Sequence, residues 1–221
     1  MGYAPTMKVG IIGGTGGIGQ GMALRLSQNH TVYIGSRLEE KAQAACEMCS
    51  YALKVLGLPF DLIPTTNQGV VDQADVVVFS IPAENLERTI ESLQGLEGKT
   101  IISLMNPMVR ADFFKYNPPA EGSAAQQLQK LLPQSKVVAA FNNIPAGKWQ
   151  KLSEPLDYTV CVCSDHADAK TEVMELVNSI SELKALDAGP LAVSPYVEAI
   201  TPLVINIARF SKKRDVGVYF K

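Results

Sequence analysis

The amino-acid sequence predicts an α/β protein with a doubly wound, mostly parallel sheet, followed by a small C-terminal helical segment. Short apolar stretches alternate with amphipathic stretches along most of the chain. The stretch 75–82, DVVVFSIP, is apolar and rich in β-branched residues, which is typical of a strand covered on both faces. A length of 221 residues suffices for one full-sized core and is too short for two independent ones.

The alternation assigns an element to nearly every stretch of the first 190 residues. The expected strands are 8–12, 31–35, a weaker one at 59–64, 75–82, 100–104, 136–141, 158–163 and 184–190. The expected helices are 19–28, 38–56, 83–93, 122–132, a short one near 146–152, and 168–180. Residues 117–123, NPPAEGS, are expected to form a loop.

The C-terminal part has a different pattern. Residues 194–210 predict a helix with apolar residues on more than one face and with Pro202 inside it. Such a helix must be buried by its own subunit or by another, so we expect a homodimer. The last residues, 215–221, are expected to form a short strand, and residues 1–6 a disordered lead-in.

Charge and composition exclude several classes of protein. The formal net charge is −2, which gives no overall attraction to nucleic acid or to an anionic membrane surface. We see no apolar run long enough to span a bilayer and no signal peptide, and therefore expect a cytoplasmic protein without nucleic-acid or membrane partners. The four cysteines are expected to be buried and structural rather than metal ligands, and His30 and His166 to lie on the surface.

The most informative stretch is Val9 to Gly21, VGIIGGTGGIGQG. It contains a G-x-G-x-x-G motif at Gly14, Gly16 and Gly19, placed between a predicted strand and a predicted helix. In this context the first glycine permits a sharp turn, the second lets a pyrophosphate approach the backbone, and the third lets the helix pack on the strand. Helix N–H groups and the Thr15 hydroxyl can then bind phosphate. The motif predicts a Rossmann-like dinucleotide site.

The end of the second strand indicates which dinucleotide is bound. NAD sites usually place a carboxylate there, to bind the ribose 2′-hydroxyl. This sequence has no acid at that point and instead has Ser36, Arg37 and, one turn into the helix, Lys41. Two cations and a hydroxyl suit the 2′-phosphate of NADP. We therefore predict NADP as the cofactor.

The other strand ends carry few ionisable groups. They read Ser80-Ile81-Pro82, Met105-Asn106-Pro107 and Phe141 to Ala146, FNNIPA. A dehydrogenase for alcohols needs a general acid or base, and none is placed at these ends, so we predict no catalytic side chain. An apolar, amide-lined cavity suits hydride transfer between two stacked rings.

These residues resemble those of a known family, the NADPH-dependent reductases of the deazaflavin coenzyme F420. The similarity extends over essentially the whole chain. The similar stretches are GGTGGIGQGMALRL, IGSRLEEKA, SIPAENL, GSAAQQLQ, VVAAFNNIPA, CVCSDHADA, LDAGPL and VEAITPLVINIARF. The combination of GSR with Lys41, FNNIPA and the tail helix is more specific than the glycine motif.

The resemblance implies hydride transfer between NADP(H) and F420, without a covalent intermediate. It implies that the pyrophosphate lies on Thr15, Gly16, Gly17 and Ile18, between Gly14 and Gly19. It also implies that a second set of residues lines the nicotinamide and deazaflavin pocket: Ile81, Pro82, Asn106, Asn143, Ile144 and Ala146. Residues 1–190 would form the NADP-binding domain, and residues 191–221 would complete the second pocket and the dimer.

Two alternatives share the same sequence features. The first is an NADPH reductase of the same fold that passes hydride to a flavin or electrons on to a ferric chelate. The second is a protein that senses NADP without turning it over. Asn106, where an apolar residue also occurs in the family, and the loosely similar tail SKKRDVGVYFK leave the second pocket less well defined than the NADP site.

Overall fold

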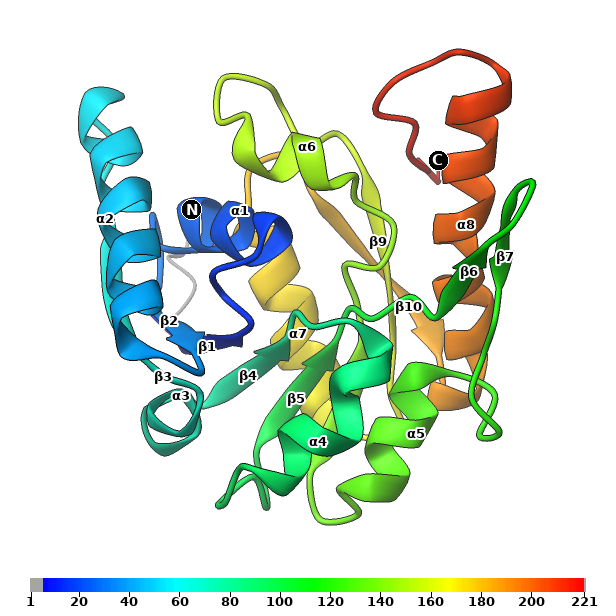
Figure 1. The fold of residues 1–221 in the computed structure, drawn as a ribbon, viewed down its shortest axis with the longest axis horizontal. Helices are drawn as coiled ribbons and strands as arrows, with labels where there is room; N and C mark the ends of the chain where they lie inside the picture. The colour runs from blue at the N-terminus through cyan, green and yellow to red at the C-terminus, as the bar shows by residue number, and fades with distance from the viewer. Residues whose placement is uncertain (1–5, 221) are drawn as a thin grey trace.

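The computed structural model describes residues 6–220 and shows one eight-stranded sheet with helices on both faces (Figure 1). The strand order is β10-β9-β8-β5-β4-β1-β2-β3, and β6 and β7 form a separate hairpin. This confirms the Rossmann-like, doubly wound fold. The strands are β1 Lys8–Ile12, β2 Thr31–Ser36, β3 Asp61–Thr66, β4 Val76–Phe79, β5 Thr100–Ser103, β6 Met108–Arg110, β7 Phe114–Tyr116, β8 Lys136–Ala139, β9 Thr159–Cys163 and β10 Lys184–Gly189.

Two apolar layers hold the helices on the sheet. Val9 and Ile11 of β1 face the layer that includes α1, α2 and α7, whereas Ile12 faces the layer that includes α3, α4 and α5. This is the alternation expected of a strand covered on both faces. The helices are α1 Gly17–Leu26, α2 Glu39–Val55, α3 Asn67–Gln73, η1 Ala83–Asn85, α4 Leu86–Glu91, α5 Ala124–Leu131, α6 Ala146–Gln150, α7 Ala167–Asn178, η2 Leu191–Val193 and α8 Ser194–Phe210.

The strand direction reverses between β8 and β9. The pairs from β3 through β8 are parallel, but β8 meets β9 in an antiparallel bridge between Ala139 and Cys163. Side-chain bonds fix the reversal, because Ser164 donates to the Val137 carbonyl and Asn143 to the Thr159 carbonyl. β10 then runs parallel to β9. The carboxyl ends of β1, β2, β4, β5 and β8 therefore share one edge, and β9 and β10 do not contribute theirs.

Some elements differ from the sequence-based prediction. The helix α3 and the hairpin β6–β7 were not predicted. The expected strand at 215–221 is absent from its described part, 215–220. That segment is irregular and accepts a hydrogen bond from the Thr159 amide at the Val218 carbonyl. The prediction for residues 1–6 lies outside the described residues, except for Thr6.

The C-terminal helix corrects one expectation about membranes. The stretch Leu191–Phe210 is long and apolar enough to cross a bilayer by length and composition alone, although a buried core helix can pass the same test. Its inner face packs on the protein, where Glu198 is fully buried and Val197 and Pro202 are nearly so. Its outer face leaves Tyr196 and Phe210 largely exposed.

The histidine prediction is wrong for His30. Its ring is 2% exposed, accepts a hydrogen bond from the Met7 amide and bonds the Ser179 hydroxyl. Burial lowers the pKa of His30. The sequence places His30 between a helix and a strand, where polar residues are often solvated, so packing against α7 decided the outcome. His166 is half-buried.

The cysteines are free thiols, and Cys161 is only half-buried while the other three are buried. Burial raises the pKa of Cys49 to about 11 and that of Cys163 to about 12. Thiols held in the protonated form are poor nucleophiles and poor metal ligands. Their chemistry agrees with a structural role.

Candidate functional site

The glycine turn after β1 forms the centre of the site. Gly13, just before the motif, has a φ of +77° and so adopts the left-handed backbone that favours glycine. At Gly14 an added Cβ would lie 2.9 Å from the Ile11 carbonyl oxygen, so the turn needs a glycine there too. A Cβ at Gly13 would lie 2.4 Å from the Ser80 carbonyl oxygen at the end of β4. A Cβ at Gly19 would lie 2.7 Å from the Gly13 carbonyl oxygen. The turn is thus pressed between the start of α1 and the end of β4.

The start of α1 leaves backbone donors free for a ligand. Gln20 is the first residue whose amide donates into the helix, to the Gly16 carbonyl at 2.9 Å. The N–H groups of residues 17–19 therefore have no acceptor within the helix. The first turn of α1 contains no acidic residue. At Gly16 an added Cβ would meet only the Gly13 carbonyl, at 3.5 Å, so a phosphate has room to approach.

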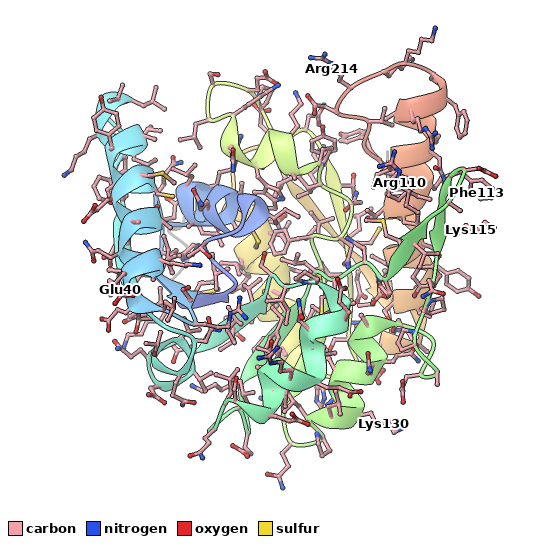
Figure 2. The ribbon with its side chains drawn as sticks, viewed as in Figure 1. Glu40, Arg110, Phe113, Lys115, Lys130 and Arg214 are labelled. Carbon is pink, nitrogen blue, oxygen red and sulfur yellow. The ribbon has the colours of Figure 1, made fainter. Side chains whose placement is uncertain are left out.

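The end of β2 supplies the charged part of the site. Ser36 closes the strand, and its hydroxyl accepts a hydrogen bond from the Leu38 amide at 3.4 Å. Arg37 and Lys41 are exposed and form none of the ion pairs found in residues 6–220. Glu40, from the same turn of α2, lies at the outer edge of the molecule (Figure 2). The two cations are available to an anion.

The turn, the end of β2 and α4 enclose one cleft of about 870 Å³. Its lining contains three cations, Arg37, Lys41 and Arg88, and no carboxylate. The predicted residues in the lining are Thr15, Gly16, Ser36, Arg37, Lys41, Ile81 and Pro82. The structure therefore brings the predicted phosphate residues and the first two ring residues to one cavity.

The remaining predicted residues are not in the lining of this cleft. Gly14, Gly17, Ile18 and Gly19 shape the turn and the start of α1. Asn106, after β5, donates to the Asn142 carbonyl at 3.0 Å.

The stretch after β8 contributes the other three predicted residues, which differ in exposure. Asn143 and Ile144 are nearly fully buried. Ala146, the first residue of α6, is exposed.

The C-terminal helix reaches the same edge of the sheet. The Thr201 hydroxyl donates to the Asn142 carbonyl at 2.5 Å, so α8 and the ends of β5 and β8 meet at Asn142. Farther along, Asn206 exchanges two hydrogen bonds with the backbone of Phe114 in β7. Figure 2 labels Arg110, Phe113 and Lys115 on this hairpin.

Sequence reasoning missed several residues of the cleft. Arg88, Thr89 and Ser92 line it from α4, and Asn67 and Gln68 line it from the start of α3. The start of α3 has one signal in the sequence, because Thr66 is a residue type preferred at the N-cap of a helix. In the structure its hydroxyl accepts a hydrogen bond from the Gly69 amide three residues on. No short motif marks Arg88, which reaches the cleft only through the fold.

The chain matches a family model described as NADP oxidoreductase, coenzyme F420-dependent, over residues 8–107. It is 38% identical to a Methanocaldococcus jannaschii protein named F420-dependent NADP reductase, over 96% of this chain and 97% of that one. A protein of the same name from Methanothermobacter thermautotrophicus is 35% identical, over 96% and 94%.

The chain belongs to the F420-dependent NADP reductase family. A solved structure titled as a putative F420-dependent NADP reductase from an Arthrobacter species has the same fold, with a TM-score of 0.79 over 97% of this chain and 99% of that one, at 23% identity. An Aspergillus terreus reductive aminase in complex with NADPH is more distant, with a TM-score of 0.60 over 94% and 61% and 18% identity. The two named relatives thus match 96% of this chain.

Proposed function

We propose that this chain catalyses hydride transfer between NADP(H) and coenzyme F420. In the direction of F420 reduction, the nicotinamide gives a hydride to the deazaflavin ring, and a proton from solvent completes the reduced product. The protein holds both rings in one orientation and excludes water between them. No side chain has to exchange a proton with a substrate hydroxyl, which agrees with the amide-rich strand ends.

The glycine turn binds the pyrophosphate through Thr15, Gly16, Gly17 and Ile18, with Gly14 and Gly19 shaping the backbone. Ser36, Arg37 and Lys41 bind the 2′-phosphate. The observation that carries this assignment is the cleft itself, whose lining contains Gly13, Thr15 and Gly16 of the turn together with three cations and no carboxylate. A 2′-phosphate dianion gains from Ser36, Arg37 and Lys41, whereas a bare 2′-hydroxyl gains little from two cations.

The two rings lie at the edge where β4, β5 and β8 end. Ile81, Pro82, Asn106, Asn143, Ile144 and Ala146 form or support this pocket, and the segment 191–221 completes it as a part separate from the NADP-binding domain 1–190. The contact between Thr201 and the Asn142 carbonyl supports this arrangement, because it places α8 beside the strand ends.

The test combines purified protein with NADPH and F420 and follows the deazaflavin absorbance. We expect loss of the F420 band with NADPH and much slower loss with NADH. Parallel reactions contain FMN or a ferric chelate in place of F420. Absence of turnover with any acceptor would contradict the enzyme assignment and favour the NADP-sensing alternative.

One comparison supports the second candidate, a flavin or ferric reductase. The chain is 28% identical to the rat Metalloreductase STEAP3 over 87% of this chain but only 36% of that protein. Turnover with FMN or ferric chelate and none with F420 would favour this candidate. That result would agree with the proposed NADP site and would replace F420 by a flavin or a ferric chelate as the electron acceptor.

We also infer that the protein is a homodimer whose contact includes the outer face of α8. Four large apolar side chains lie on that face, Tyr196, Leu203, Ile207 and Phe210, all exposed in the single chain. Covering them removes apolar area from water. Light scattering at micromolar concentration tests this: we expect a dimer mass and, for Leu203→Asp, a monomer mass. A monomer mass for the wild type would contradict the inference.

We propose that this enzyme is cytoplasmic. Its partners are then the small-molecule cofactors that serve as its substrates, and it binds neither nucleic acid nor a membrane. The net charge of −2 supports the absence of nucleic-acid binding. Membrane flotation and fractionation of the native host would test the location, and recovery in the membrane fraction would contradict it.

A further inference from the structure

One wall of the cleft comes from a helix that carries none of the predicted cofactor residues. Asn85, Arg88, Thr89 and Ser92 line the cavity. Their spacing of three and four residues places them on one face of η1 and α4. Thr89 and Ser92 use their hydroxyl donors locally, on the backbone carbonyls of Asn85 and Thr89. Arg88 is the charged member of this wall.

The Arg88 side chain has no partner in residues 6–220. It is exposed and takes part in none of the hydrogen bonds or ion pairs of the described structure. Glu84 and Glu91 lie four residues before it and three after it, at spacings that normally allow pairing on a helix. Arg88 nevertheless lines the cavity. Its charge is therefore available to whatever enters the cleft.

A second guanidinium lines the same cavity. Arg37 and Leu38 follow β2 and line the same cavity. Thr66, Asn67 and Gln68 line the same cavity. The Gln68 amide is bonded to Asp72 and to the Gln94 backbone, whereas the Asn67 Oδ1 has no hydrogen-bond partner among the described residues. Asn and Gln amides pair well with the amino group and ring nitrogens of adenine, and guanidinium planes stack on the face of a base. A flat, uncharged, nitrogen-rich ring fits such a lining.

We propose that Arg88 is an adenine-binding residue that stacks on the base of the dinucleotide from the α4 side. This inference rests on the proposed function only in taking NADP(H) as the ligand. It separates two tasks in one cleft. Arg37 with Ser36 and Lys41 distinguishes the 2′-phosphate, whereas Arg88 binds the part that NADPH and NADH share.

Binding of each nucleotide to the full-length protein, without F420, tests the division. NADPH and NADH are titrated by their own fluorescence against wild type, Arg88→Ala, Arg88→Lys and Arg37→Ala. We expect Arg88→Ala to raise the Kd for both nucleotides by the same factor, about three- to tenfold. Arg88→Lys should resemble Arg88→Ala, because an ammonium keeps the charge and loses the plane. Arg37→Ala should weaken NADPH far more than NADH.

Lys130→Ala is the matched control, since Lys130 is an exposed cation on α5 that does not line the cleft (Figure 2). Thermal unfolding verifies that each variant is folded. A loss confined to NADPH, or full rescue by lysine, would assign Arg88 to the 2′-phosphate and overturn the proposal. Unchanged affinity for both nucleotides would also overturn it. Wild-type protein that binds NADPH but never reduces F420 would contradict the proposed function. The effect of the Arg88 variants on nucleotide binding would still test the role of Arg88.

Discussion

The cleft and the protein interior use charged side chains in opposite ways. In the cleft, Arg37, Lys41 and Arg88 are exposed and unpaired within residues 6–220. In the interior, Arg25 is 8% exposed and donates to four backbone carbonyls at the end of α6 and just beyond it. The fully buried Glu198 accepts from the amides of residues 124 and 125 and from a tyrosine hydroxyl.

The difference shows how to distinguish a binding charge from a structural one. A buried ion costs much free energy unless it has hydrogen-bond partners, and here Arg25 has four carbonyl acceptors and Glu198 has three donors. An exposed cation stays hydrated, so it costs little free energy of folding even when no partner is bound. Substitutions in the interior should therefore lower stability, and substitutions in the cleft should lower affinity at constant stability.

The largest expected effect is that of Arg25→Ala. The variant removes the side-chain donor to four backbone carbonyls near residues 148–154, of which those of Lys148 and Lys151 still accept a backbone amide. We expect a loss of about 2–4 kcal/mol in the free energy of unfolding, measured in urea. Arg25→Lys should recover only part, because one ammonium cannot reach the same set of carbonyls. A loss of stability as small as that of a surface substitution would contradict the structural role of Arg25.

The Glu198 carboxyl should make stability depend on pH. Burial raises its pKa to about 7, from an ordinary value of 4.5, against the lowering effect of its three donors. Below pH 4.5 both states hold the proton. Between about pH 4.5 and 7 only the unfolded chain releases it, so stability falls as pH rises, by about 2–4 kcal/mol in total.

Urea unfolding of wild type and Glu198→Gln at pH 5 and pH 8 isolates this contribution. We expect the wild type to lose more stability between these pH values than the variant does. His30 acts in the other direction, because its lowered pKa makes stability fall as pH decreases below 6.5, but it is the same in both proteins. Equal pH dependence in the two proteins would show that Glu198 has an ordinary pKa.

Arg37→Ala should change affinity and leave stability nearly constant. Loss of a charge-assisted pair to the 2′-phosphate should weaken NADPH by about 1.5–3 kcal/mol and NADH much less. Titration of both nucleotides measures the effect, and the urea midpoint should not move. An equal loss for both nucleotides would contradict the NADP assignment.

The smallest effect is expected for Lys130→Ala. Its ion pair with Glu121 lies on the surface, where the lysine side chain is 73% exposed. Solvent and salt screen such a pair. We expect neither the urea midpoint nor the NADPH affinity to change measurably. A clear change in either would mean that α5 is coupled to the cleft.

Most of the fold could be predicted from the sequence. Buried strands such as Val76–Phe79 are short apolar runs rich in β-branched residues, and the amphipathic helices show a helical period of apolar residues. The exceptions have physical reasons. Residues 67–73 contain a glycine and too few turns for a clear helical period. Residues 108–116 lack the Asn-Gly or Asp-Gly turn that marks a tight hairpin. At 215–220 the chain follows β9 through single hydrogen bonds rather than a ladder.

The lining of the cleft was predictable where its residues are close in sequence, and the role of each residue there stays a prediction. Thr15 to Gly19 and Ser36 to Lys41 each belong to one strand–helix junction, so a motif describes them. Arg88 reaches the cleft from another element, and nothing in its local sequence distinguishes it from a helix-surface arginine. The motif does not say which of the adjacent glycines adopts a positive φ, because the two give identical local signals and only the contact with Ser80 distinguishes Gly13.

The reversal of direction after β8 has a consequence for how such enzymes can diverge. Because β9 and β10 turn their carboxyl ends away, the half of the edge proposed to hold the rings is left to the β6–β7 hairpin and to α8. Both lie outside the segments proposed to bind the phosphates. Substitutions in the hairpin and in roughly the last thirty residues could therefore change the electron acceptor in evolution, while the segments proposed to bind the dinucleotide stay the same. Grafting those two segments between relatives is the engineering route that this topology leaves open.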